Sequence, residues 1–226
     1  MKKAILMAIQ PQYLFQILNG EKIDEIRKTI PKCELPIDVY LYCTKSNLNL
    51  YSEFVEVWQY FDGAVAEPFA EFKQLNLTSE KLEINKKIRT GRLSRLFRTR
   101  LNGKVPAKFT LKICEELACE DLGYEKIFYT ETKDDITNSS CLSQDQIILY
   151  LGNQKKYKNG EIVGSDWQID NLEIFDKPME LSDFKIKNKE LQQYGSFGWV
   201  LDNQSNFVSL TKAPQSWQYV YVEDNK

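Results

Sequence analysis

The order in which strand patterns and helix patterns follow one another constrains the fold of this chain most strongly. Outside residues 46–100, the sequence opens with a buried strand pattern over residues 4–9, continues with one helix pattern and several strand patterns, and closes with a second helix pattern and two more strands. Strands and helices do not alternate as they do in a doubly wound α/β sheet. A mixed or largely antiparallel α+β domain is therefore predicted. A chain of 226 residues is long enough to bury a hydrophobic core without disulfide bonds or a structural metal ion.

The individual elements are predicted from apolar periodicity and from end signals. Leu14, Ile17 and Leu18 fall on one helical face, and Asn19-Gly20 supplies a helix stop. Ser143 and Gln146 have the spacing of a capping box that opens a helix ending at Gly152. Strands are predicted for residues 22–28, 39–43, 103–113, 167–175 and 217–222.

Two further helices are predicted between residues 46 and 100. One covers residues 52–60. The other is a basic amphipathic helix over residues 92–101, because apolar side chains recur there at helical spacing with arginines between them, namely Leu93, Leu96, Phe97 and Leu101. Residues 185–206 are polar and contain glycine, which predicts a loop or a hairpin excursion.

The chain contains no histidine, which excludes His-based triads, His general bases and His metal ligands. We expect no metal site and no cofactor, since the cysteine spacings match no known metal-binding pattern. The longest apolar stretches are too short for a membrane span or a signal sequence, so no membrane association is expected. An odd number of unevenly spaced cysteines is typical of a reducing compartment, and a cytoplasmic location is expected: Cys33, Cys43, Cys114, Cys119 and Cys141.

Charge is segregated along the chain although the net charge is only −2. Residues 86–108 carry nine basic side chains and no acidic one, whereas the rest of the chain carries an excess of acidic groups. Such a block is either a solvated surface or a contact for a polyanion. The candidate nucleic-acid-binding residues are Arg89, Arg92, Arg95, Arg98, Arg100 and Lys104.

The segment Gly20-Glu21-Lys22-Ile23-Asp24-Glu25-Ile26-Arg27 combines a turn with three charged residues of interest. Lys22 directly follows the turn and can project a cation that binds phosphate or another oxyanion. Glu25 and Arg27 fall on one face of a strand and can pair with each other. A solvated lysine and a purely structural ion pair are the alternatives.

This segment matches the G-x-K-x-x-E-x-R motif of the ASCH domain, a family within the PUA-like superfold. Residues 5–18, 102–105, 109, 167, 176–181 and 214–220 also resemble longer ASCH proteins that phages and prophages often carry. The resemblance implies a single domain over residues 1–226, built as a curved, mixed PUA-like β-barrel with flanking helices. Residues 46–100 and 185–210 are interpreted as insertions, the first of them partly helical.

The resemblance also implies a cleft that binds RNA or a modified nucleotide, lined by Lys22, Glu25 and Arg27. Some small ASCH proteins are amidohydrolases acting on N4-acetylcytidine, and use the motif lysine, a threonine three residues later and a later glutamate. Glu25 stands at the threonine position, so the hydroxyl nucleophile is absent here. A hydrolase in which Lys22 and Glu25 direct a water remains an alternative, with Glu115 or Glu116 as loose candidates for the later acid. A second alternative is a phage-type accessory protein that binds another protein.

Overall fold

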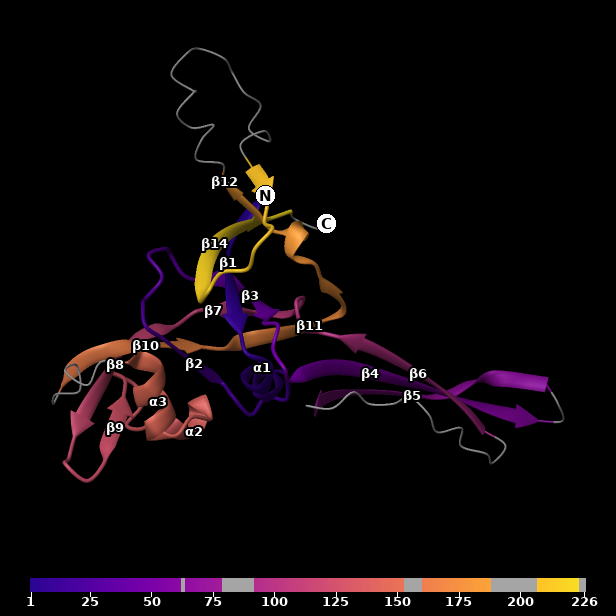
Figure 1. The fold of residues 1–226 in the computed structure, drawn as a ribbon, viewed down its shortest axis with the longest axis horizontal. Helices are drawn as coiled ribbons and strands as arrows, with labels where there is room; N and C mark the ends of the chain where they lie inside the picture. Colours follow the sequence, from indigo (N-terminus) through magenta and orange to yellow (C-terminus); the bar gives the residue numbers. More distant parts are fainter. Residues whose placement is uncertain (62–63, 79–91, 153–159, 188–206, 224–226) are drawn as a thin grey trace, which may run out of the picture.

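The computed structural model describes residues 1–61, 64–78, 92–152, 160–187 and 207–223. This part of the chain is predominantly β, with few helices, and its strands form three sheets (Figure 1). The pairing is mostly antiparallel, with one parallel pair between the first and third strands. The prediction of mixed, largely antiparallel strand pairing is confirmed, and the described chain is mostly β with a few helices.

The largest sheet has seven strands and curls into a half-barrel. The parallel pair within it is joined by a crossover that contains α1 (Pro11–Leu18) and β2 (Asp24–Arg27). Pro11 occupies the first helical position, where its missing N–H does no harm. In spatial order the strands are β11 (Asp170–Met179), β7 (Val105–Leu111), β3 (Ile37–Cys43), β1 (Lys2–Ile9), β14 (Trp217–Val222), β12 (Lys185–Lys187) and β13 (Phe207–Ser209).

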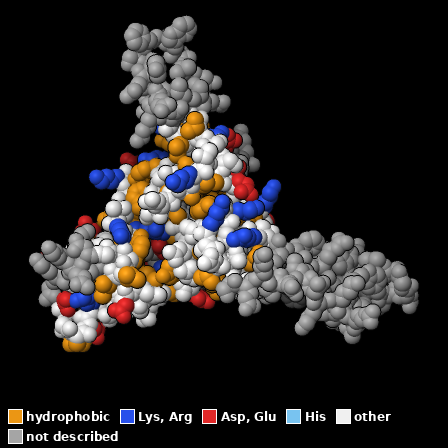
Figure 2. Space-filling view, in the orientation of Figure 1, with side chains coloured by type: hydrophobic (Ala, Val, Ile, Leu, Met, Phe, Trp, Pro, Cys, Tyr) orange, Lys and Arg blue, Asp and Glu red, His pale blue; other side chains and the backbone are white. Residues whose placement is uncertain are grey.

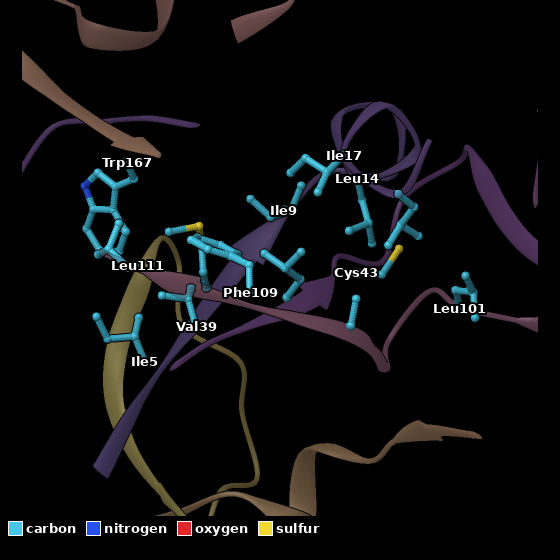
Figure 3. Close-up of a cluster of buried hydrophobic side chains, with 14 of the residues drawn as sticks. Ile5, Ile9, Leu14, Ile17, Val39, Cys43, Leu101, Phe109, Leu111 and Trp167 are labelled. Atoms are coloured by element: carbon cyan, nitrogen blue, oxygen red, sulfur yellow. The ribbon is translucent and has the colours of Figure 1, made fainter. Parts of the chain in front are cut away.

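The half-barrel has apolar clusters on both faces, which explains the unbroken apolar run in β1. Ile5, Met7 and Ile9 point into one cluster, which also contains Phe109 and Trp167 and is shown in Figure 3. The residues between them on β1 point into a second cluster on the opposite face. A strand buried on both faces is a nearly continuous hydrophobic segment rather than an alternating one.

A four-stranded sheet carries the remaining helices. Its order is β2, β10 (Glu161–Gln168), β8 (Cys114–Asp121) and β9 (Lys126–Tyr129), with α2 (Thr137–Ser140) and α3 (Gln144–Leu151) packed beside it. The capping box of Ser143 and Gln146 is present and Gly152 ends α3, as predicted. The single strand predicted for residues 167–175 is wrong, because the chain leaves β10 at Gln168 and enters β11 in the other sheet.

The helices predicted for residues 52–60 and 92–101 are also wrong. These segments form β4 (Asn49–Phe61) and β6 (Arg92–Arg100). In a three-stranded sheet, β4 pairs with β5 (Ala64–Thr78) on one edge and with β6 on the other. β4 is the central strand, so hydrogen bonding on both of its edges outweighs the helical spacing of its apolar residues. The described part of the first insertion is thus not helical, and its sheet extends away from the half-barrel (Figure 1).

The second insertion has a hairpin base, because β12 and β13 pair antiparallel. Residues 188–206, including the loop expected there, lie outside the described residues. No helix in the described chain is both long and apolar enough to cross a membrane.

Candidate functional site

β2 and the turn before it position the three motif residues. α1 ends at Leu18, and Gly20 adopts a φ of 75°, a left-handed conformation that glycine accepts without strain. The backbone N–H of Lys22 donates to the Gln16 carbonyl oxygen, which folds Lys22 back toward α1. β2 then pairs antiparallel with β10, so that Glu25 lies opposite Trp167.

The three side chains form one connected row. Lys22 Nζ lies 3.3 Å from Glu25 Oε2, and Arg27 Nη2 lies 3.1 Å from Glu25 Oε1. The predicted strand face shared by Glu25 and Arg27 is therefore confirmed. Glu25 neutralises one of two cations, which leaves one excess positive charge in the row.

Protein hydrogen bonds hold both cations in place. Lys22 Nζ donates to the Ser140 carbonyl oxygen at 2.5 Å, and Arg27 Nη2 donates to the Ala8 carbonyl oxygen at 3.1 Å. Arg27 Nη1 also donates to Ser216 Oγ at 3.3 Å. Lys22 is only 1% exposed, Glu25 8% and Arg27 4%. A solvated lysine is excluded, and the buried charges are partnered as burial requires.

This row lines a cavity of about 370 Å³. The cavity lies where α1, β2, α3 and the segment before β14 meet, and its size is within the range typical of small-molecule sites. Among the described residues that line it, Glu25 supplies the carboxylate and Lys22 and Arg27 supply the cations. The polar and aromatic wall includes Gln10, Tyr13, Thr44, Gln146, Tyr150 and Gln215.

The cavity is suited to a ligand with a negative charge, a polar edge and a flat apolar face. The ammonium and guanidinium groups favour an anion, the glutamine amides can donate and accept, and the tyrosine rings can pack against a planar group. The loose acid candidates are not part of this arrangement. Both residues belong to β8 of the four-stranded sheet, and neither lines the cavity. Glu115 accepts a hydrogen bond from Thr132, and Glu116 is exposed.

None of the described residues of the basic block, residues 86–108, lines the cavity. Arg89 lies outside the described residues, and Arg92, Arg95 and Arg98 belong to β6, so the predicted helical face of arginines does not exist. Arg100 is exposed, and Lys104 forms a 3.0 Å ion pair with Glu180. On the face shown in Figure 2, the described basic side chains are scattered among hydrophobic and acidic ones rather than gathered into one patch.

A second buried charge cluster lies on the opposite face of β2. Lys133 Nζ contacts Asp24 Oδ1 at 2.6 Å and Asp166 Oδ2 at 3.0 Å, and both aspartates are almost completely buried. Burial, followed by the charge of Asp24, raises the pKa of Asp166 to about 6. Burial alone would lower the pKa of Lys133, but the hydrogen bonds to the two aspartates and their negative charges together outweigh burial and raise it. Within the described residues, no group of acidic or cysteine side chains is arranged to hold a metal ion.

The segment from Lys133 to Ser140 makes contacts on both sides of β2. Lys133 holds Asp24 on one face, and the Ser140 carbonyl holds Lys22 on the other. Sequence reasoning missed this cluster because its members are far apart along the chain. The only local sign was that Asp24 alternates with Glu25 and Arg27 and so had to face the other way.

Comparison with known proteins adds no relative: no family model, curated protein or solved structure matches the chain.

Proposed function

We propose that the protein is an ASCH-type, PUA-like module that binds a nucleotide, either free or within RNA, in the cavity lined by Lys22, Glu25 and Arg27. The observation that carries the proposal is the buried row of these three residues, with its single excess positive charge, at the wall of a ligand-sized cavity. The curled half-barrel and the position of the motif just after α1 support the relationship to the PUA-like superfold.

The chemistry of the wall suits each part of a nucleotide. A phosphate or another anionic group would lie against the excess positive charge. A base would pack against Tyr13 or Tyr150, and the amides of Gln10 and Gln215 would bond its edges. Tyr13 is also close to the charged row, with its ring centre 6.0 Å from Lys22 Nζ.

Binding is favoured over hydrolysis because the motif residues are already engaged. Lys22 is bonded to the Ser140 carbonyl oxygen and lies against Glu25, and the hydroxyl expected at position 25 is absent. This arrangement is suited to holding a fixed charge rather than to exchanging a proton with a substrate.

Isothermal titration calorimetry with the ribonucleoside 5′-monophosphates and N4-acetylcytidine 5′-monophosphate tests the proposal. We expect at least one of them to bind the parent protein and to lose about tenfold or more in affinity with Lys22→Met, which removes the excess charge but keeps side-chain length. The matched control is Lys112→Ala, an exposed lysine paired with Asp170, which should leave affinity unchanged.

Equal affinity in the parent and in Lys22→Met would contradict the proposal. Chromatography of the same mixtures after incubation covers the alternative activity. A hydrolysis product that forms with the parent and not with Lys22→Met would show that the site hydrolyses its ligand instead of only binding it.

A further inference from the structure

β14 carries a row of aromatic side chains on one face. Trp217, Tyr219 and Tyr221 alternate with Val220 and Val222, which point into the apolar cluster on the other face of the sheet. All three residues are half-buried, and Trp217 and Tyr219 also pack against the apolar cluster that contains Ile5 and Phe109. Trp217 packs on Trp167 with ring centres 5.3 Å apart, and the row then continues away from that contact along the strand.

Neighbouring strands add cations and one more ring to this row. The register places Lys3 of β1 and Lys185 of β12 directly opposite Tyr221, on the same face. Lys3 Nζ lies 4.1 Å from the centre of the Tyr219 ring, and Lys187 Nζ lies 5.5 Å from the centre of the Tyr221 ring.

Phe207 of β13 completes the row. Its ring packs edge-on against Tyr221, with centres 4.7 Å apart. We call Trp217, Tyr219, Tyr221, Phe207, Lys3 and Lys187 the β14 track.

The β14 track has an excess of positive charge. Lys185 on this face is paired with Glu223, whereas Lys3 and Lys187, both exposed, are placed over tyrosine rings rather than against described carboxylates. A ring under an ammonium group holds it in position without neutralising it. Two fixed cations with three adjacent rings therefore favour a ligand that alternates negative charges with flat apolar groups.

The β14 track begins at the cavity. Gln215 lines the cavity, and the next residue, Ser216, accepts a hydrogen bond from Arg27. Trp217 then donates through Nε1 to Thr29, just beyond β2. Figure 1 shows β14 running from this end toward β12 and β13. From Ser216 to Tyr221 the strand covers about 17 Å, at roughly 3.3 Å per residue, which is enough for a few nucleotides.

We propose that the β14 track binds single-stranded RNA that continues from the nucleotide held in the cavity. This inference rests on the proposed function and specifies its ligand as a nucleotide within a strand rather than a free one. Phosphates bind Lys3 and Lys187, and bases pack on the rings of Tyr221 and Phe207 at the outer end of the row, as unpaired bases do on aromatic side chains of other RNA-binding sheets. Duplex RNA does not offer such splayed bases, so the β14 track should discriminate against it.

Fluorescence anisotropy with a labelled hexauridylate, compared with calorimetry of uridine 5′-monophosphate, tests this inference. The parent should bind the hexamer about tenfold or more tightly than the mononucleotide. Tyr221→Ala should lower hexamer affinity by about tenfold and leave mononucleotide affinity unchanged, because each stacked base contributes on this order. The matched control is Tyr124→Ala, which removes a highly exposed tyrosine from the turn between β8 and β9.

The charge contribution is measured separately, with Lys3→Ala and Lys187→Ala combined. Since each phosphate contact to a single strand adds about 0.7 to the slope of log affinity against log salt, this variant should flatten the slope by about 1.4. Both lysines are exposed, so this variant also keeps the test valid if Tyr221→Ala does not fold, which thermal unfolding would show.

Different failures have different signatures. Equal affinity for hexamer and mononucleotide, or a hexamer affinity that neither variant changes, would overturn the β14 track and leave the cavity proposal intact. Hexamer binding that needs Tyr221 but is indifferent to Lys22→Met would support RNA binding at the β14 track, but it would overturn the cavity proposal and with it the continuation of the strand into the cavity. Equal binding of an abasic hexamer or of polyglutamate would overturn the assignment to RNA bases and indicate a simple polyanion or an acidic protein segment.

Discussion

Glu25 occupies the central position of the site, between two buried cations, and Glu25→Gln should destabilise the protein more than any other single change in the charged row. The substitution keeps the size of the side chain and removes its charge. Lys22 and Arg27 would then be two buried cations, and no other described residue that lines the cavity carries a carboxylate.

The expected magnitude follows from the geometry. Glu25 is 8% exposed and makes contacts of 3.3 and 3.1 Å, so solvent screens it little. Removing one partner of a buried pair costs about 3 to 5 kcal/mol. Lys22→Met should cost less, about 1 to 3 kcal/mol, because Glu25 keeps Arg27 and the main loss is the donor to the Ser140 carbonyl oxygen.

Urea denaturation measures both values. With a denaturant slope of about 1 to 3 kcal/mol per molar, Glu25→Gln should lower the midpoint by roughly 1 M or more. The matched control is Glu34→Gln, at an exposed glutamate before β3, which should stay within about 0.5 kcal/mol of the parent. A Glu25→Gln protein as stable as the parent, or more stable than Lys22→Met, would refute the reasoning.

Two further substitutions probe the surroundings of the site. Because burial raises the pKa of Asp166 to about 6, the stability contributed by its protonated form is complete below about pH 4 and is lost as the pH rises through 6. Between pH 4 and pH 7 the parent should therefore lose roughly 2 to 3 kcal/mol of unfolding free energy that Asp166→Asn does not lose. Parallel pH profiles of unfolding free energy for variant and parent would contradict this. In Gly164→Ala the new Cβ would lie 2.8 Å from the Arg27 carbonyl oxygen, so a loss of about 1 to 3 kcal/mol together with weaker nucleotide binding is expected. Unchanged stability and affinity in Gly164→Ala would contradict this prediction and show that β2 can move away from the new Cβ without loss.

Much of the local structure could be predicted because local chemistry determines it. Strand periodicity placed Glu25 and Arg27 on one face, and the capping box fixed the start of α3. The failures came where the same apolar residues fit two periodicities. Residues 52–60 and 92–101 have helical spacing, yet they are rich in aromatic or branched residues, and pairing across β4 decides their structure.

The candidate site was predictable only in its local part. The motif named Lys22, Glu25 and Arg27, but the groups that hold them are 118 and 189 residues away, at Ser140 and Ser216. No spacing rule connects such distant positions. The β14 track was hidden for the same reason, since its aromatic residues predicted a strand but not the lysines that other strands bring over its rings.

If the charged row binds an anionic nucleotide, the NMR signal of the Arg27 side chain should respond to that nucleotide. Arg27 Nε is buried, without a hydrogen-bond partner in the described structure, and its ¹⁵N resonance can be assigned with Arg27→Lys in arginine-labelled protein. We expect a binding nucleoside monophosphate to shift this resonance and the matching nucleoside without phosphate to shift it less. A resonance that stays in place at saturating nucleotide would show that the phosphate does not bind at the charged row.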